Sequence, residues 1–386
     1  MNKVADAVVI GGGMLGIGTA HALATRGLTV SVVEAVRLAG GTTGNSFAWL
    51  NATSKTEDET YHRLNRAGME RYGELAETFG EAAVRHGEAG EISWSDPSVA
   101  DSDSALTERA KQLTALDYPV EFLDADDLTK LEPNVAFPEG AVGLMSVLDR
   151  WLDAPRLVRR MAQDIERLGG AIHEDCAVTG FTRSANGAIA SVETYAGTIN
   201  ASHVIIAAGV MSPRLVALAA GPAGPYVPVD GLEGLLIDVP PDLGEELAHH
   251  ILHPPEAGGL HFRPGDDGGL LIGAEDMAGF LANADEATAI AHGRQQLLSR
   301  ALKYLPRLPM AAAKLRARAR VGVRPMPEDG LPIVGPVDGV AGLYVMATHS
   351  GITLGPLLGS LVAEEIVTGA MPEMLAPYRP QRFQQL

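Results

Sequence analysis

The sequence contains one cysteine, Cys176, in 386 residues. A single cysteine excludes an internal disulfide, a multi-cysteine metal site and an iron–sulfur cluster, and we predict no metal centre. No apolar run reaches the roughly 18 residues of a membrane-spanning helix. The stretch after Lys3, AVVIGGGMLGIGTA, is apolar enough for a signal peptide, but its clustered glycines would weaken a secretory helix. We therefore expect no transmembrane segment and a reducing compartment, the cytoplasm.

Basic residues are also scarce. The chain has 30 Lys and Arg residues against 48 Asp and Glu residues, which gives a formal net charge of −18. Such a chain repels phosphate backbones and anionic membranes, so nucleic acid is not an expected partner. One local arginine can still bind a small anionic substrate. The hydrophobic fraction of 46% allows a sizeable core, and the length predicts two or three domains.

The first 34 residues have the pattern of a βαβ unit. Residues 7–10 and 29–33 are short apolar runs typical of buried strands, and residues 14–26 have the apolar spacing of a helix. The motif Gly11-x-Gly13-x-x-Gly16 lies between the first strand and the helix. Glu34 ends the second strand.

Each part of this motif has a physical role. Gly11 permits a tight turn, Gly13 lets the backbone approach a pyrophosphate, and Gly16 lets the helix pack on the strand. The N–H groups of Met14 and Leu15 meet the negative charge at the helix N-terminus. Glu34 follows Gly16 by 18 residues and can accept hydrogen bonds from ribose hydroxyls. The unit predicts a dinucleotide site.

Three features favour FAD over NAD. Residues 40–55 form a long polar loop rich in Gly, Thr and Asn. The apolar strand 204–207 ends in Ala208 and Gly209. A second glycine-rich segment, residues 349–355, precedes a helix expected over 356–367, whose N-terminus can point at the flavin.

The sequence here resembles the FAD-dependent amino-acid and amine oxidoreductases that include D-amino acid oxidase, glycine oxidase and sarcosine oxidase. The matching segments are GGGMLG with Glu34, the GTTGNS loop, VIIAAG (204–209), RVGVRPMPEDGLPIVGP (320–336) and ATHSGITLGP (347–356). The resemblance covers the flavin-binding parts at both ends of the chain and fades through 90–150 and 225–310. With the motif, it implies cofactor contacts from Gly11, Gly13, Met14, Leu15, Gly16, Glu34, Ala35, Thr42, Thr43, Gly44, Asn45, Ser46, Val178, Ala208, Gly209, Arg324, Ser350, Gly351, Ile352, Thr353 and Leu354.

The expected fold class is α/β with an α+β substrate domain. A Rossmann-like FAD-binding domain of the glutathione-reductase type would carry an inserted substrate domain built on an antiparallel sheet. We expect residues 1–85, 141–225 and 320–386 to form the discontinuous FAD-binding domain. Residues 86–140 and 226–319 would form the substrate-binding domain.

Arg324 is the main candidate for substrate binding. Polar and apolar residues alternate strictly from Lys314 to Val323, which predicts a strand with Lys314, Arg316, Arg318 and Arg320 on one solvated face. Arg324 continues that parity next to the flavin-edge segment, and in relatives an arginine here pairs with the substrate carboxylate. A structural ion pair is the alternative.

Further candidates for substrate contact or catalysis are weaker. His261 and Arg263 precede the LLIG strand, where relatives place substrate-facing side chains, and His349 adjoins the flavin segment. Trp49 and Asn51 lie shortly after the GTTGNS segment, in the same polar loop. Core packing, a loop cap or a sheet-edge position are the alternatives for these residues.

Two departures from the sarcosine-type pattern bear on the chemistry. Met326 stands in the stretch where those relatives attach the flavin to a cysteine, so we expect non-covalent FAD. The lysine that those relatives carry near the strand around Leu271, and use to activate oxygen, is missing here. Cys176 is expected to be buried filler.

The expected activity is oxidation of a C–N bond beside a carboxylate, by hydride transfer to flavin N5, to an imine that hydrolyses. The substrate would be a D-amino acid, glycine or an N-alkyl amino acid, and oxygen or another acceptor would reoxidise the flavin. Two alternatives stay open. One is a dehydrogenase acting on the C–OH bond of a hydroxy acid; the other is a non-catalytic flavoprotein subunit. The sequence leaves the identity of the amine, its stereochemistry and the oligomeric state undecided.

Overall fold

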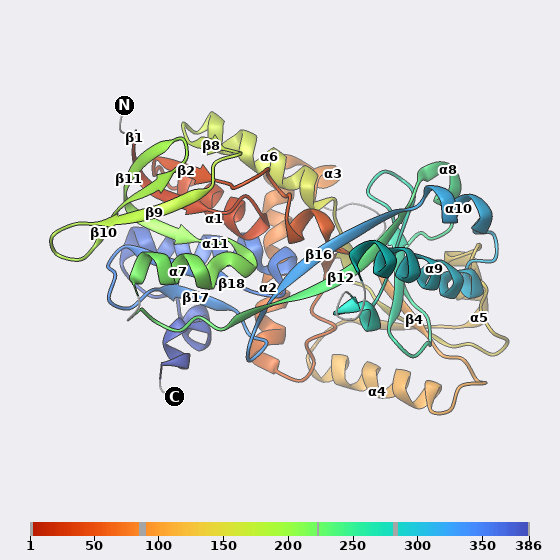
Figure 1. Ribbon diagram of the computed structural model, residues 1–386. Coiled ribbons are helices and arrows are strands. Elements are labelled where there is room, and N and C mark those ends of the chain that lie inside the picture. Colours follow the sequence, from red (N-terminus) through yellow and green to blue (C-terminus); the bar gives the residue numbers. More distant parts are fainter. Residues whose placement is uncertain (1–2, 85–89, 222–223, 281–284, 385–386) are drawn as a thin grey trace.

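The structure is a computed structural model that describes residues 3–84, 90–221, 224–280 and 285–384. It has two parts side by side, joined by the long strands β12 and β16 (Figure 1). One part is an α/β domain that contains both ends of the described chain. The other is a broad, mainly antiparallel sheet with helices against it.

The α/β domain is built on the sheet β17-β18-β11-β1-β2-β8. Its strands are β1 (Lys3–Ile10), β2 (Val30–Val33), β8 (Ala171–His173), β11 (Gly197–Ile206), β17 (Ile333–Pro336) and β18 (Leu343–Ala347). β1 runs parallel to both β2 and β11, and β18 runs parallel to β11, whereas β17 is antiparallel. β1 near the start of the sequence and β18 near its end thus lie on either side of β11.

Both faces of this sheet are covered. Ala7 and Val9 of β1 pack with the helices α1 (Met14–Thr25), α2 (Glu59–Phe79), α6 (Ala154–Arg167) and α11 (Gly351–Thr368). Val8 and Ile10 point to the other face, towards α7 (Ser212–Ala220) and the hairpin of β9 (Val178–Arg183) and β10 (Ile189–Thr194). The alternation follows from the two-residue period of a strand.

Smaller elements of this part are α3 (Glu81–Val84), η1 (Thr42–Asn45), η2 (Gly209–Met211), η5 (Glu373–Tyr378), η6 (Pro380–Phe383) and the short pair β3 (Trp49–Leu50) and β7 (Arg150–Trp151).

The second part is the sheet β16-β12-β15-β14-β13-β4-β6-β5. Its strands are β4 (Glu91–Trp94), β5 (Val120–Leu123), β6 (Gly143–Ser146), β12 (Val229–Val239), β13 (Ile251–His253), β14 (Leu260–Pro264), β15 (Leu270–Ala274) and β16 (Arg318–Pro327). The helix α9 (Glu286–Tyr304) packs on β12, β14 and β15. The other helices are α4 (Ser102–Ala115), α5 (Ala125–Leu131), α8 (Pro241–Gly244), α10 (Met310–Arg316) and the turn η3 (Glu275–Met277). The expected fold class, a Rossmann-like domain with an antiparallel-sheet partner, is confirmed.

The sheets place two strands across the expected domain boundaries. β6 pairs with β4 and β5 in the second sheet, although it lies after residue 141. β16 pairs with β12 along its whole length, although most of it lies after residue 320.

The strictly alternating segment after Lys314 is not one strand, so that prediction is wrong. Lys314 and Arg316 belong to helix α10, and β16 begins only at Arg318. The run MAAAKLR has strong intrinsic helix propensity, which a two-residue alternation of basic residues with Leu and Ala does not override. The basic face of the strand is therefore limited to Arg318, Arg320 and Arg324.

The last helix begins at Gly351, five residues before the expected start at Pro356. A proline inside a helix removes the hydrogen bond to the carbonyl four residues earlier. Here that carbonyl belongs to Ile352, and it accepts a hydrogen bond from the hydroxyl of Tyr72 on α2. Because a side chain replaces the missing N–H donor, the helix continues through the proline.

Helices α1 and α11 contact each other backbone to backbone. A Cβ placed on Gly359 would lie 2.5 Å from the amide nitrogen of Thr19, and one on Gly18 would lie 3.0 Å from the carbonyl oxygen of Gly355. By length and composition α11 could cross a membrane, and it is the one such helix among the described residues. It packs against α1 and α2, with Leu354, Leu358 and Val362 fully buried, as a core helix does.

We expect Gly359→Val to destabilise the protein by about 2–3 kcal/mol, because backbone atoms of α1 cannot move away from the added side chain. The measurement is thermal or denaturant unfolding of the purified protein. Glu364→Ala, an exposed position on the same helix, is the control and should leave the unfolding midpoint nearly unchanged. Equal midpoints for Gly359→Val and the parent would contradict the close contact.

Candidate active site

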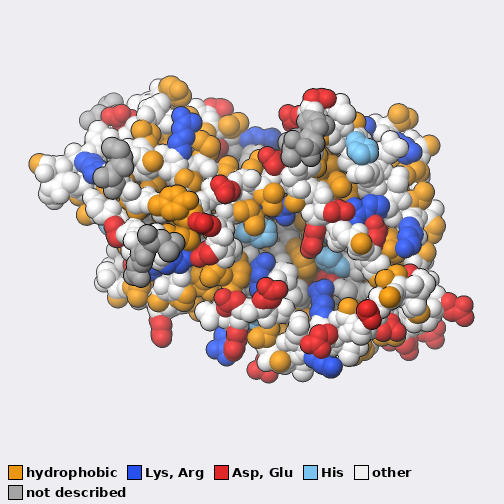
Figure 2. All heavy atoms as spheres, turned by 60° about the horizontal axis from the view of Figure 1, so that its bottom comes forward, with side chains coloured by type: hydrophobic (Ala, Val, Ile, Leu, Met, Phe, Trp, Pro, Cys, Tyr) orange, Lys and Arg blue, Asp and Glu red, His pale blue; other side chains and the backbone are white. Residues whose placement is uncertain are grey.

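A cavity of about 1400 Å³ lies between the two parts of the molecule. It is lined by the start of α1, the loop after residue 40, β12, β14, β16 and the first turn of α11. Figure 2 shows the molecule hollowed near the middle of one face, with basic and histidine side chains around the hollow and acidic side chains nearby. Pockets for small molecules commonly have volumes of about 300–1000 Å³, so this cavity has room for a long ligand.

The glycine motif forms the turn into α1. Gly11 has φ = +119°, and a Cβ there would lie 2.3 Å from the carbonyl oxygen of Ala207. A Cβ on Gly16 would lie 2.0 Å from the carbonyl oxygen of Gly11, so Gly16 permits the helix to pack on the turn. Gly13 lines the cavity as the N-cap residue of α1, and as a glycine it has no side chain to cap the helix. The amide of Met14 donates to Thr43 Oγ1 over 3.0 Å.

Glu34 lies where β2 ends and lines the cavity. Its Oε2 accepts a hydrogen bond from the amide of Gly12 (2.7 Å), and its Oε1 accepts one from the amide of Val36 (2.9 Å). Each carboxylate oxygen has a second lone pair, so both can also accept hydroxyl donors. Ala35, Cys176 and Val178 line the same region of the cavity.

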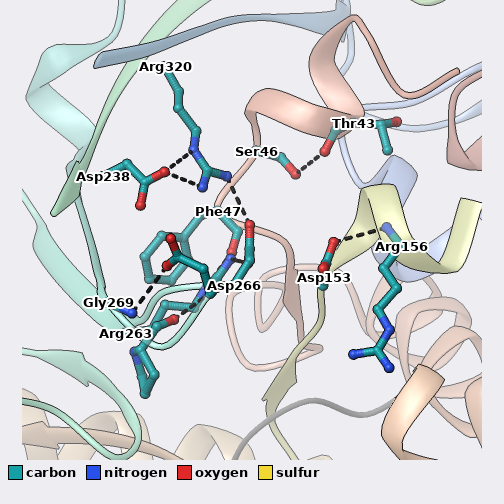
Figure 3. Close-up of polar contacts among 12 residues, drawn as sticks. Thr43, Ser46, Phe47, Asp153, Arg156, Asp238, Arg263, Asp266, Gly269 and Arg320 are labelled. Atoms are coloured by element: carbon teal, nitrogen blue, oxygen red, sulfur yellow. Dashed lines mark hydrogen bonds and ion pairs between the residues drawn. The ribbon is translucent and has the colours of Figure 1, made fainter. Parts of the chain in front are cut away.

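The polar loop and the start of α11 form another wall. Thr42 Oγ1 donates to the carbonyl of Val323 on β16 (2.5 Å), which ties the loop to that strand. Ser46 Oγ donates to the carbonyl of Thr43 (3.0 Å; Figure 3), which holds the loop in a turn. At α11, Ser350 is an N-cap residue whose side chain does not cap the helix, and residues 350–353 line the cavity.

This arrangement fits FAD. Two helix N-termini whose own N-cap residues, Gly13 and Ser350, make no side-chain cap line one cavity, and such ends present N–H donors and partial positive charge to anions. The turn at α1 suits a pyrophosphate, Glu34 suits a ribose, and the start of α11 suits an electron-rich edge of a flavin ring. The cavity volume accommodates the dinucleotide together with a small substrate.

Four polar side chains that line the cavity lie close enough to interact electrostatically. Arg324, His349, Lys55 and Glu275 all line it. Arg324 is half-buried on β16, and its Nε is buried without a hydrogen-bond partner among the described residues. Burial lowers the pKa of Arg324, while the charge of Glu275 opposes that shift. A half-buried guanidinium with an unsatisfied donor is suited to bind an anion.

His261 and His349, two of the histidines that line the cavity, have lowered pKa values and are neutral at physiological pH. Burial lowers the pKa of His349 to about 4, and the charges of Lys55 and Arg324 add to this effect. Burial, with the neighbouring His253 and Arg324, lowers the pKa of His261 to about 3. His261 Nδ1 lies 2.9 Å from the carbonyl of Gly259 and must donate to it, so Nε2 keeps its lone pair.

A buried polar layer supports the aromatic wall of the cavity. Trp49 lines the cavity, and its Nε1 donates to Asp149 Oδ2 (2.7 Å), which also accepts from Thr53 (2.9 Å). Burial and the nearby Glu91 raise the pKa of Asp149 to about 7. The ring of Trp49 packs at 4.9 Å against His253, whose Nδ1 lies 3.0 Å from Glu91.

Arg263 is not in the cavity, contrary to the prediction that it binds substrate. It is fully buried between the rings of Trp151 (4.4 Å) and Phe47 (5.4 Å). Its Nε donates to the carbonyl of Phe47 (2.7 Å), and a second nitrogen donates to Asp266 (2.8 Å; Figure 3). These contacts join the second sheet to the polar loop of residues 40–55.

Most other residues singled out in the sequence line the cavity. They are Gly11, Gly13, Met14, Leu15, Glu34, Ala35, Thr42, Thr43, Asn45, Ser46, Trp49, Asn51, Val178, Ala208, Gly209, His261, Arg324, His349, Ser350, Gly351, Ile352 and Thr353. Gly16, Gly44 and Leu354 do not line it. A Cβ on Gly44 would lie 2.3 Å from the carbonyl of Ala39, and Leu354 is buried in the helical core.

Sequence reasoning missed several lining residues. Two of them could have been found from the sequence. Lys55 follows Asn51 in the same loop, and Glu275 directly follows the LLIGA strand. His253 and Tyr195 carried no signal, since neither stands in a motif.

The comparisons with known proteins agree with this geometry. The family model "DAO: FAD dependent oxidoreductase" matches residues 6–365. The chain is similar to the "uncharacterized oxidoreductase YurR" of Bacillus subtilis (strain 168), with 29% identity over 97% of this chain and 98% of that protein. It is similar to glycine oxidase of Bacillus licheniformis, with 29% identity over 95% of this chain and 94% of that protein. The crystal structure of glycine oxidase from Geobacillus kaustophilus superposes with a TM-score of 0.81 and 25% identity, covering 99% of both chains.

The match extends over both sheets, the turn into α1 and the start of α11. The chain therefore belongs to the DAO family of FAD-dependent oxidoreductases, which are enzymes.

Proposed function

We propose that this enzyme oxidises the C–N bond of a small amino acid or secondary amine: a D-amino acid, glycine or an N-alkyl amino acid. The observation that carries the proposal is Arg324, a half-buried guanidinium in the cavity with an unsatisfied Nε. Relatives named glycine oxidase support an amino acid as the substrate class.

Arg324 would bind the substrate carboxylate through two parallel hydrogen bonds. This contact fixes the orientation of the carbon that carries the amine, and such positioning replaces a bimolecular encounter. When bound, FAD supplies an acceptor for the hydride that leaves this carbon. The substrate thereby becomes an imine, which water hydrolyses to a carbonyl compound and an amine. Oxygen or another acceptor would remove the electrons.

The neutral histidines suit an amine better than an alcohol. The substrate nitrogen has to lose its ammonium proton, after which no strong base is needed. The lone pair on His261 Nε2 can accept a hydrogen bond from the amine. With pKa values of about 3 and about 4, His261 and His349 would be weak bases for removing the proton of an alcohol.

We also propose that FAD is bound non-covalently and that the enzyme works in the cytoplasm. Cys176 lies next to Ala177 and Val178 on the side of Glu34, and no cysteine lines the flavin end among the described residues. A chain with one buried cysteine suits a reducing compartment.

Glu34→Ala should weaken FAD binding roughly ten- to one hundred-fold, since a hydrogen bond to a charged group contributes about 1.5–3 kcal/mol. Turnover at saturating FAD should change less. The measurement is FAD titration of the apoprotein. Glu174→Ala is the control, because Glu174 also accepts a loop amide, that of Leu38, but does not line the cavity. Unchanged FAD affinity in Glu34→Ala would remove Glu34 from the cofactor site.

Arg324→Lys should weaken substrate binding and slow flavin reduction by a combined ~2–4 kcal/mol, because an ammonium cannot make both hydrogen bonds to a carboxylate. Anaerobic stopped-flow reduction and a melting curve test this. Arg318→Lys, an exposed change on the same strand, is the control. A purely structural arginine would instead give a lower melting temperature with normal reduction kinetics.

The pH dependence of flavin reduction should be set by the pKa of the substrate amine. His261 and His349 stay neutral between about pH 6 and 8 because their pKa values are low, so these two side chains should contribute no step there. The rate should rise with pH as the amine deprotonates. For two substrates whose amine pKa values differ by about one unit, the rising parts of the two pH–rate profiles should be shifted by that difference. If the rate rises at the same pH for both substrates, the titrating group belongs to the enzyme instead.

A further inference from the structure

Lys55 is a second cation in the cavity that the proposed reaction does not use. It lines the cavity from the loop after β3, and burial lowers its pKa. No hydrogen bond and no ion pair within 4 Å joins its ammonium to another residue in the described part of the chain. The nearest aromatic contact is the ring of Tyr61, whose centre is 5.7 Å away.

The backbone that presents Lys55 is fixed. The amide of Lys55 donates to the carbonyl of Ala52 (3.0 Å), and Ser54 Oγ donates to Asn51 Oδ1 (2.6 Å). The amide of Asn51 is in turn 3.4 Å from Thr353 Oγ1 on the first turn of α11. The loop is therefore attached to the wall of the cavity, and these hydrogen bonds hold the backbone of Lys55 in place.

Lys55 and Arg324 share one end of the cavity. Both charges lower the pKa of His349, and both cations interact with Glu275. Glu275 is exposed and reaches the cavity at its rim, where water screens its charge. Two half-buried cations thus have one screened carboxylate between them. Burying a charge is unfavourable unless it is paired, which indicates that a ligand supplies more than one negative group.

We propose that the substrate is an amine with two carboxylates, one bound by Arg324 and the other by Lys55. This inference rests on the proposed amine oxidation and names its substrate class. The charges balance, because Arg324, Lys55 and Glu275 sum to +1 and an ammonium with two carboxylates sums to −1. The local positive charge stands out in a chain with a net charge of −18. Amines of this class include N-carboxyalkyl amino acids and amino acids with an acidic side chain.

Matched pairs of ligands test the assignment on the holoenzyme. Thiodiacetate and methylthioacetate carry sulfur in place of nitrogen and cannot form an imine, so their binding can be titrated through the flavin absorbance. We expect thiodiacetate to bind at least ten-fold more tightly than methylthioacetate. Lys55→Met should reduce that ratio about ten-fold or more, the range expected for a hydrogen bond between charged groups. Lys55→Arg should restore much of it.

The same comparison is made for turnover with iminodiacetate against sarcosine, and with D-aspartate against D-alanine. A higher kcat/KM for the dicarboxylate in either pair, lost in Lys55→Met, supports the proposal and shows where the second carboxylate belongs. Lys130→Met, an exposed lysine on α5, controls for the change in net charge.

Three results would overturn the proposal. One is an unchanged dicarboxylate preference in Lys55→Met. Another is an equal loss for both members of each pair, or weaker FAD binding, which would assign Lys55 to the cofactor or the fold. The third is a defect confined to flavin reoxidation. The proposed amine oxidation fails separately, if no amine in either pair bleaches the flavin of the parent enzyme under anaerobic conditions.

Discussion

The close contact between α1 and α11 is the constraint on which the site depends. Gly18, Gly355 and Gly359 allow the two backbones to touch, as the 2.5 Å and 3.0 Å Cβ clearances show. The two helices come from opposite ends of the chain, and this contact aligns their N-termini on one cavity. An anion at either N-terminus meets N–H donors and the positive end of a helix dipole. A side chain larger than hydrogen at these positions would separate the helices and the walls they provide.

The second constraint is the attachment of the polar loop, residues 40–55, to the second sheet. Arg263 donates to the carbonyl of Phe47 and to Asp266, while Arg320 bridges Asp266 (2.9 Å) and Asp238 (Figure 3). Both arginines of this group are paired with its carboxylates, so neither cation is available to a ligand. Their function is to hold the loop that contributes Trp49 and Lys55 to the cavity.

Cations with carboxylate partners stabilise the fold of this protein, whereas cations without such partners are the candidates for ligand binding. Arg263 and Arg320 each have carboxylate partners within 3 Å, whereas Arg324 and Lys55 have none at that distance among the described residues. Because an unpaired buried cation is costly, the second pair marks where a negatively charged ligand belongs. Burial is the main cause of the low pKa of His349, and the positive charges of Lys55 and Arg324 lower it further.

Local sequence alone determined the turn into α1 and the position of Glu34. The turn at Gly11, the helix beginning at Met14 and the acid at Glu34 lie within 34 residues, so their geometry depends on short-range backbone rules. The roles of the basic residues, in contrast, depended on tertiary structure. Arg263 and Arg324 are both basic residues on strands, and only the packing against Trp151 and Asp266 showed that Arg263 is structural. Lys314 and Arg316 alternate like a strand but form a helix, because local helix propensity outweighed the pattern. Lys55 gained its importance when the fold brought it near Arg324, 269 positions away in the sequence. A motif encodes contacts between near neighbours, but the charge balance of a cavity is set by residues that only folding brings together.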